Sequence, residues 1–196
     1  MNLKTVKNWL LNNGHEQVFQ DKSEVSVLVE TDDGDAEIVV KDMDDMFVIE
    51  AFPVIVKDHK DSMTSQPILI GEKKIMQVMT YAYGISSGWP GIHISVDPVN
   101  GNVSASIFML KPEIVYDDDD EPESMRYRMD MMNMFLAYFI PGMYEVLCSN
   151  TSPVEIYTRQ LVEIRKNRRC KGFFRGKIRY RSPNKQKGRK YGKEKG

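Results

Sequence analysis

Gly84, Ser86 and Gly88 have the spacing G-x-S-x-G, which in some hydrolases presents a nucleophilic serine. That chemistry requires a strand before the serine and a helix after it, because the sharp turn between them exposes the hydroxyl. Here Ile70–Tyr83 has helical spacing, and the alternation typical of a strand starts at Ile92. Because the order is inverted, we interpret the motif as a helix-to-strand loop and predict no nucleophile.

Residues that could bind a metal ion do not cluster locally. His15, His59 and His93 stand apart from other ligand types, whereas a zinc site needs three or four converging ligands. The acidic runs lack the central Gly and terminal Glu of an EF-hand loop, and we interpret them as solvated turns. These runs are Asp32–Asp35, Asp42–Asp45 and Asp117–Glu121. We therefore expect no catalytic residue, metal, cofactor or small-molecule substrate, and the chain is predicted not to be an enzyme.

Methionine and aromatic residues concentrate between Met125 and Met143. Methionine is flexible and polarizable, which suits an adaptable binding surface, although the same residues at helical spacing can simply form a core. Because they lie on more than one side of the predicted helix, one face is expected to bind a protein client or a second copy of the chain. The candidate partner-binding residues are Met129, Met132, Phe135 and Phe139.

Charge divides the chain at Ile164. Arg165–Gly196 contains 15 Lys/Arg and a single acid, or about +14, while the preceding residues carry about −15, although the formal net charge is only −1. Basic side chains release counterions from phosphates, and interleaved aromatics stack on unpaired bases. The tail therefore has candidate residues for nonspecific RNA or DNA binding: Arg168, Arg169, Lys171, Phe174, Arg175, Lys177, Arg179, Arg181, Arg189 and Lys190.

The acidic part of the chain competes with nucleic acid for this tail. Where the two approach within a Debye length of about 8 Å, they attract each other. Docking of the tail on its own body or on a second copy, a purely solubilising tail, and nucleic-acid binding all stay open from the sequence.

Periodicity places these residues on an α+β domain. A short helix at Leu3–Asn12 ends at Asn13-Gly14, and three strands follow between Val25 and Phe52, with Asp32-Asp33-Gly34 as a hairpin turn. After a looser stretch comes the helix Ile70–Tyr83. The remaining predicted elements are strands at Ile92–Val96 and Val103–Leu110, a helix at Glu123–Leu147 that Pro141-Gly142 kinks or ends, and a helix at Val154–Ile164 with Ser152 as cap and Pro153 at its first position.

The order α-βββ-α-ββ-α, with helices packed on an antiparallel sheet, resembles the bacterial YbjN-type sensory transduction regulator domain, which shares its fold with type III secretion chaperones. The similar pieces are WLLNNG, the run EVSVLVETDDGDAEIVVKDMDDMFVIEAF, the hairpin ISVDPVNGNVSASIFM and the methionine-rich helix, within residues 1–150. The resemblance implies protein binding, with a homodimer or client interface. It does not extend to the basic tail.

We therefore expect an acidic domain over residues 1–164 and a basic, disordered tail over 165–196. Cys148 and Cys170 are too few for a disulfide scaffold, the N-terminal apolar stretch is too short for a signal peptide, and Met131–Leu147 is a poor membrane span. The prediction is a cytoplasmic, non-enzymatic protein-binding or regulatory module. The alternative is a nucleic-acid-associated protein that binds through its tail.

Overall fold

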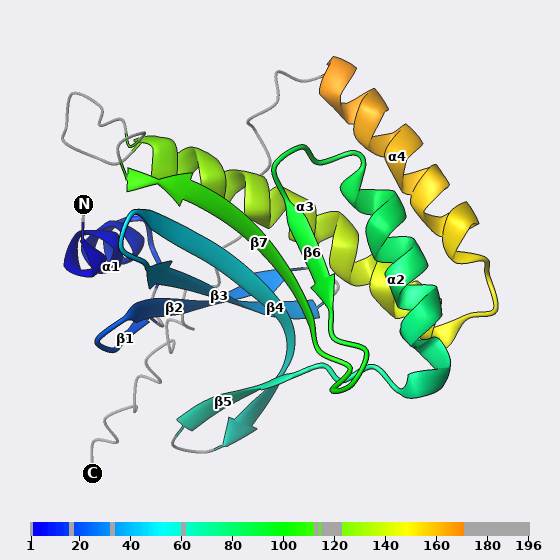
Figure 1. Ribbon diagram of the computed structural model, residues 1–196, viewed down its shortest axis with the longest axis horizontal. Helices are drawn as coiled ribbons and strands as arrows, with labels where there is room; N and C mark the ends of the chain where they lie inside the picture. Colours follow the sequence, from blue (N-terminus) through cyan, green and yellow to red (C-terminus); the bar gives the residue numbers. More distant parts are fainter. Residues whose placement is uncertain are drawn as a thin grey trace, which may run out of the picture.

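The computed structural model of the chain describes residues 2–15, 18–31, 34–59, 62–111, 114 and 123–170. Within them lie four helices and seven strands, arranged as an α+β fold (Figure 1). Their order is α1 (Leu3–Asn12), β1 (Val18–Gln20), β2 (Glu24–Thr31), β3 (Gly34–Asp42), β4 (Met46–His59), β5 (Ser62–Pro67), α2 (Glu72–Ser86), β6 (His93–Val96), β7 (Val103–Leu110), α3 (Glu123–Cys148) and α4 (Pro153–Cys170).

The seven strands form one antiparallel sheet. Its order is β1-β2-β3-β4-β7-β6, and β5 pairs with the second half of β4. β4 is the longest strand because its first half lies between β3 and β7, while residues from Val54 onward continue into the hairpin with β5. This hairpin projects from the sheet in Figure 1.

One face of the sheet forms the core together with the helices. Alternation places the same apolar row in register across neighbouring strands, with Val40 opposite both Val25 and Ile49. Ile49 also pairs with Ile107, and all four side chains are buried. Helix α3 crosses behind this sheet in Figure 1 and completes the layer. A period of two residues thus directs every second side chain toward α3.

Helices α2 and α4 pack on α3 through aromatic and polar contacts. The ring of Tyr81 in α2 stacks on Phe139 of α3 at 5.7 Å, and Trp89, just after α2, meets Phe135 edge-on at 5.9 Å. The Lys74 ammonium donates hydrogen bonds to the carbonyls of Val146 and Ser149, at 2.9 and 3.2 Å. These carbonyls lie at the C-terminal end of α3, where a cation also complements the helix dipole.

The predicted helices and strands are largely confirmed. Helix α1 has the predicted bounds, with Gly14 at φ 87° just beyond it, and β7 spans the predicted residues. Pro153 is the first residue of α4 as expected, and Gly101 at φ 70° belongs to the turn predicted between β6 and β7. In the β2–β3 turn, Asp32 and Asp33 lie outside the described residues.

Several expectations need correction. The looser stretch after Phe52 contains the rest of β4 and β5, and β1 was not predicted. Helix α3 continues through Pro141 to Cys148, and α4 ends six residues after the predicted Ile164. Residues 165–170 of the proposed tail are therefore helical, whereas residues 171–196 lie outside the described part of the chain.

Candidate partner-binding surface

The methionine-rich helix does not present the expected binding residues. Met129, Met132, Phe135 and Phe139 are all buried among the sheet and the other helices. Their role as a partner-binding face is therefore corrected: in this fold they form the core, and a partner reaches them only if the helices separate. The residues appear on several sides of α3 because α3 is covered on several sides, by the sheet, α2 and α4.

The opposite face of the sheet carries the apolar side chains that the described helices leave uncovered. We call it the open face. It consists of the alternate residues Phe19, Glu24, Ser26, Leu28, Glu30, Asp35, Glu37, Val39, Lys41, Met46, Val48, Glu50, Phe52, His93, Ser95, Ser104, Ser106, Phe108 and Leu110. None of these belongs to the main core cluster. A sheet with one solvated face ordinarily alternates apolar with polar residues, so apolar residues on both faces call for an explanation.

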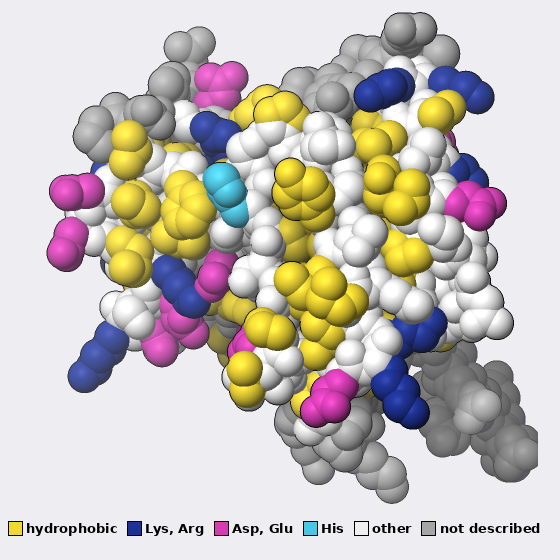
Figure 2. Space-filling model, turned by 45° about the vertical axis from the view of Figure 1, so that its right-hand side comes forward, with side chains coloured by type: hydrophobic (Ala, Val, Ile, Leu, Met, Phe, Trp, Pro, Cys, Tyr) yellow, Lys and Arg dark blue, Asp and Glu magenta, His cyan; other side chains and the backbone are white. Residues whose placement is uncertain are grey.

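Two aromatic side chains of the open face are exposed. Phe19 is 63% exposed at the β1 edge, and Phe108 is 48% exposed near the β6 edge. Phe108 lies opposite Val48, and its ring centre is 5.4 Å from that of His93. Figure 2 shows hydrophobic side chains grouped beside the histidine in this region of the surface.

The interior of the open face is more protected. Val39, on the central strand β3, is only 7% exposed. The β4–β5 hairpin approaches the same side, since the Ser65 hydroxyl donates a 3.0 Å hydrogen bond to the Glu37 carboxylate. The open face thus combines a shielded apolar centre with exposed aromatics at both ends.

Acidic residues predominate among the charged members of the open face. By alternation its described part has a single lysine against five acids, which are Glu24, Glu30, Asp35, Glu37 and Glu50. That lysine, Lys41, forms an ion pair with Glu50 across β3 and β4. The surface is therefore chemically suited to an apolar partner with basic side chains.

A second exposed apolar row lies on α2. Met76, Met79 and Tyr83 share one side of this helix, and Tyr83 is 84% exposed. Threonine and glutamine flank this row, so it is narrower than the open face. Substitutions in this row can therefore serve as a control for substitutions on the open face.

The G-x-S-x-G motif lies at the end of α2 and not in a strand–turn–helix arrangement. The Ser86 hydroxyl donates to the carbonyl of Tyr83 at 2.8 Å, within the helix. Gly84 and Gly88 lie against Tyr157 and Leu161 of α4, so close that an added Cβ would overlap these side chains. The two glycines allow α2 and α4 to pack closely, which corrects our interpretation of this stretch as a loop.

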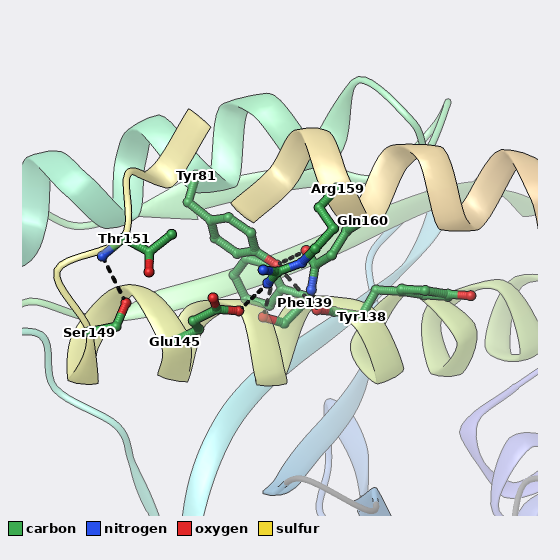
Figure 3. Close-up of polar contacts among 8 residues, drawn as sticks. All are labelled: Tyr81, Tyr138, Phe139, Glu145, Ser149, Thr151, Arg159 and Gln160. Carbon is green, nitrogen blue, oxygen red and sulfur yellow. Dashed lines mark hydrogen bonds and ion pairs between the residues drawn. The ribbon is translucent and has the colours of Figure 1, made fainter. Parts of the chain in front are cut away.

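A buried polar cluster joins the three helices around Pro141 (Figure 3). The Tyr81 hydroxyl donates to Gln160 Oε1 at 2.9 Å and lies 3.2 and 3.3 Å from the carbonyls of Tyr138 and Phe139. Gln160 Nε2 donates to the same Tyr138 carbonyl at 2.9 Å. A proline weakens the helical hydrogen bonding one turn before it, and the cluster supplies donors to that turn.

The groups with shifted pKa values in the described chain each respond to local causes. Burial lowers the pKa of His15 and raises those of Tyr81 and Asp130. Backbone hydrogen bonds from Val99 and Asn100, with the Asn100 side chain, lower the pKa of Asp97 in the β6–β7 turn. In none of these is a second titratable side chain the largest cause, so no coupled acid–base pair is evident among them.

The acidic turns and the basic residues are placed only in part. Asp42 forms a 2.6 Å ion pair with Lys111, which also donates to the Asp44 carbonyl and so links the β3–β4 turn to the end of β7. No metal-binding group of His, Cys, Asp or Glu occurs among the described residues. Arg168 and Arg169 belong to the last turns of α4, without described side chains. His59 is also without a described side chain, and the other candidate nucleic-acid residues, together with Asp117–Glu121, lie outside the described residues.

Comparisons with known proteins add little to this geometry. No protein-family model matches the chain. No curated protein matches it either. A crystal structure of an uncharacterized protein from Methanothermobacter thermautotrophicus is similar over 71% of this chain and 99% of that chain, with 14% sequence identity and a TM-score of 0.36.

Helix α3 is long and apolar enough to span a membrane by length and composition. However, 56% of its most apolar window is buried inside the fold. This burial is typical of the central helix of a soluble α+β domain.

Proposed function

We propose that this protein is a non-enzymatic protein-binding module that acts in the cytoplasm through the open face of its sheet. The observation that carries the proposal is the group of exposed aromatic and aliphatic side chains on a sheet face that no described helix covers. Large exposed apolar patches mark interaction sites in soluble proteins. The resemblance to regulator and secretion-chaperone domains supports the same class of function.

The partner we propose is a protein client or a second copy of the chain. Aromatic residues are enriched at such interfaces, where a few of them contribute most of the binding free energy. Phe19 and Phe108 meet this description, while the acidic residues around them favour a partner that carries Lys or Arg.

Nucleic-acid binding through the tail is the second candidate function. It is favoured by the 15 Lys/Arg between Arg165 and Gly196 and by the aromatics among them. Under this alternative the acidic domain limits the affinity for polyanions.

A pull-down with the full chain and with a chain that lacks residues 171–196, each with and without nuclease, separates the two functions. The deletion begins at Lys171 because α4 extends to Cys170. Partner capture that survives both the deletion and the nuclease supports the protein-binding module. Salt-sensitive RNA or DNA retention that is lost on deletion, without any protein partner, would support the alternative instead.

A further inference from the structure

The C-terminal segment beyond α4 is complementary to the open face. Residues 171–196 contain 11 Lys/Arg and one acid. Within Phe174–Arg181, the apolar residues Phe174, Ile178 and Tyr180 alternate with four basic ones. In an extended conformation this period of two places the apolar side chains on one side and the basic ones on the other.

A series of contacts connects the last turns of α4 to the start of β6. Asn167 Nδ2 donates to the Tyr138 hydroxyl at 2.8 Å, and the Tyr138 ring lies 6.2 Å from that of Trp89. Trp89 accepts a 3.1 Å backbone hydrogen bond from Ile92, the residue immediately before β6. β6 begins with His93, which contacts Phe108 on the open face.

The chain beyond Cys170 is long enough to cross that edge. An extended chain covers about 3.3–3.6 Å per residue, so the eleven residues from Lys171 to Arg181 can span roughly 35–40 Å. That length exceeds the width of several strands spaced about 4.8 Å apart. Phe174 lies four residues beyond Cys170 and so within about 14 Å of it, whereas Ile178 and Tyr180, eight and ten residues beyond it, can extend to about 26–36 Å. The latter two side chains can therefore reach β7 and β4.

Charge favours the same location. The described part of the open face has five acids and one lysine, and Glu37 has the neutral Ser65 hydroxyl as a hydrogen-bond partner. Basic side chains of an extended segment are long enough to reach carboxylates on both sides of it. Because attraction between exposed charges fades beyond about 8 Å at physiological salt, the pairing requires contact between segment and face.

We propose that Phe174–Arg181 binds the open face of its own chain, with Ile178 and Tyr180 toward Phe108 and Val48 and with its basic side chains toward Glu37 and Glu50. The segment then occupies the partner-binding surface until a protein partner, or a polyanion that binds the basic residues, displaces it. This inference rests on the proposed function, since it assigns a regulator to the same surface.

Photo-cross-linking in the full-length chain tests the location directly. A benzoylphenylalanine replaces Tyr180 in one variant and Tyr191 in a control variant, and both are irradiated at low protein concentration before peptide mapping. We expect position 180 to cross-link within one chain to β4 and β7, at several times the yield of position 191, and to lose most of that yield in 1 M salt. Cross-links spread evenly over the body, an equal yield from position 191, or links only between two chains would overturn the proposal.

A second measurement separates this inference from the proposed function. Phe174, Ile178 and Tyr180 are all changed to Ser in the full chain, which leaves the described fold unaltered. If the segment occupies the open face nine-tenths of the time, its release raises the apparent affinity for a second copy about tenfold. Unchanged affinity contradicts the segment's role. A Phe108→Ser variant shows which of the two proposals fails. If this variant weakens self-association while the tail substitutions change nothing, the open face is the binding surface and only the inference about the tail is wrong.

Discussion

At the scale of single residues, Gly142 determines how the three helices meet. The Tyr81 hydroxyl and Gln160 reach the backbone of α3 because residue 142 has no side chain. Burial raises the pKa of Tyr81, so this hydroxyl stays protonated as a hydrogen-bond donor at neutral pH. Unsatisfied polar groups in such a cluster cost far more than an equivalent apolar contact.

Gly142→Ala is expected to lower the free energy of unfolding by about 2–3 kcal/mol. The new Cβ would overlap the Tyr81 hydroxyl and lie 2.8 Å from Gln160 Nε2, which outweighs the helix propensity of about 1 kcal/mol gained by alanine. Urea denaturation measures the change. Gly71→Ala is the matched control, since no atom lies within 4 Å of its added Cβ, and its effect stays below about 1 kcal/mol. Equal effects of the two substitutions would contradict this account of the cluster.

The burial of His15 is expected to make the free energy of unfolding depend on pH. Burial lowers the pKa of His15 below its ordinary 6.5, so the unfolded chain binds a proton more readily than the folded one. The contribution of His15 is therefore complete above pH 6.5 and is lost as the pH falls toward its folded pKa, with a slope of at most about 1.4 kcal/mol per pH unit. His15→Gln is expected to flatten the unfolding free energy between pH 6.5 and 5.5. A slope identical to that of the wild type would exclude His15 as its source.

At the scale of elements, the approach of α2 to α4 depends on glycines spaced four residues apart. Gly84 lies under the ring of Tyr157, and Gly88 lies under Leu161. The amino-acid spacing that resembles a hydrolase motif thus has a packing role between two helices.

Gly84→Ala tests that packing because two opposing effects meet at one position. Alanine favours the helix by about 1 kcal/mol, but its Cβ would overlap the Tyr157 ring, and overpacking costs about 1–3 kcal/mol. We expect net destabilisation in thermal unfolding. In a Tyr157→Ala background the overlap is gone, so the same substitution is expected to become stabilising. A cost that persists in that background would show that the ring is not the obstacle.

The sequence predicts the regular elements well where one face is buried. Alternation identifies β7, and helical spacing identifies α1, because each has a clear apolar side. The strands β1 and β5 escape this reasoning, since Val18–Gln20 is too short for a pattern and Ser62–Pro67 is polar and pairs at an edge. The helix beyond Ile164 is missed because most of its residues are basic and give no apolar pattern.

The candidate site was harder to predict than the fold. Methionine and phenylalanine in α3 have the composition of a binding surface, yet tertiary packing on several sides of that helix buries them. The signal for the open face lies in β4, where Val48 and Phe52 interrupt the expected alternation of apolar with polar residues. Recognising it requires the strand order, which brings Val48 beside Phe108 from a distant part of the sequence.

At the scale of the whole molecule, the two oppositely charged parts of the chain correspond to two regions that can attract each other. The acidic part of the chain includes the sheet whose open face is apolar and acidic, and the basic residues follow the last helix. An intramolecular contact has a high effective concentration and competes with any external partner. The basic tail and a basic partner are therefore expected to compete for the same surface.

Sedimentation velocity over a range of protein concentrations tests the central claim that the open face is the binding surface. Phe108 and Leu110 are each about half exposed, so burying the rest of both contributes about 2 kcal/mol, or roughly thirtyfold in Kd. We predict that the full-length chain self-associates, that Phe108→Ser with Leu110→Ser weakens this about thirtyfold, and that Met76→Ser with Tyr83→Ser on α2 leaves it unchanged. A wild-type chain that stays monomeric at every concentration, or an α2 variant that weakens association as much as the open-face variant, would contradict the account.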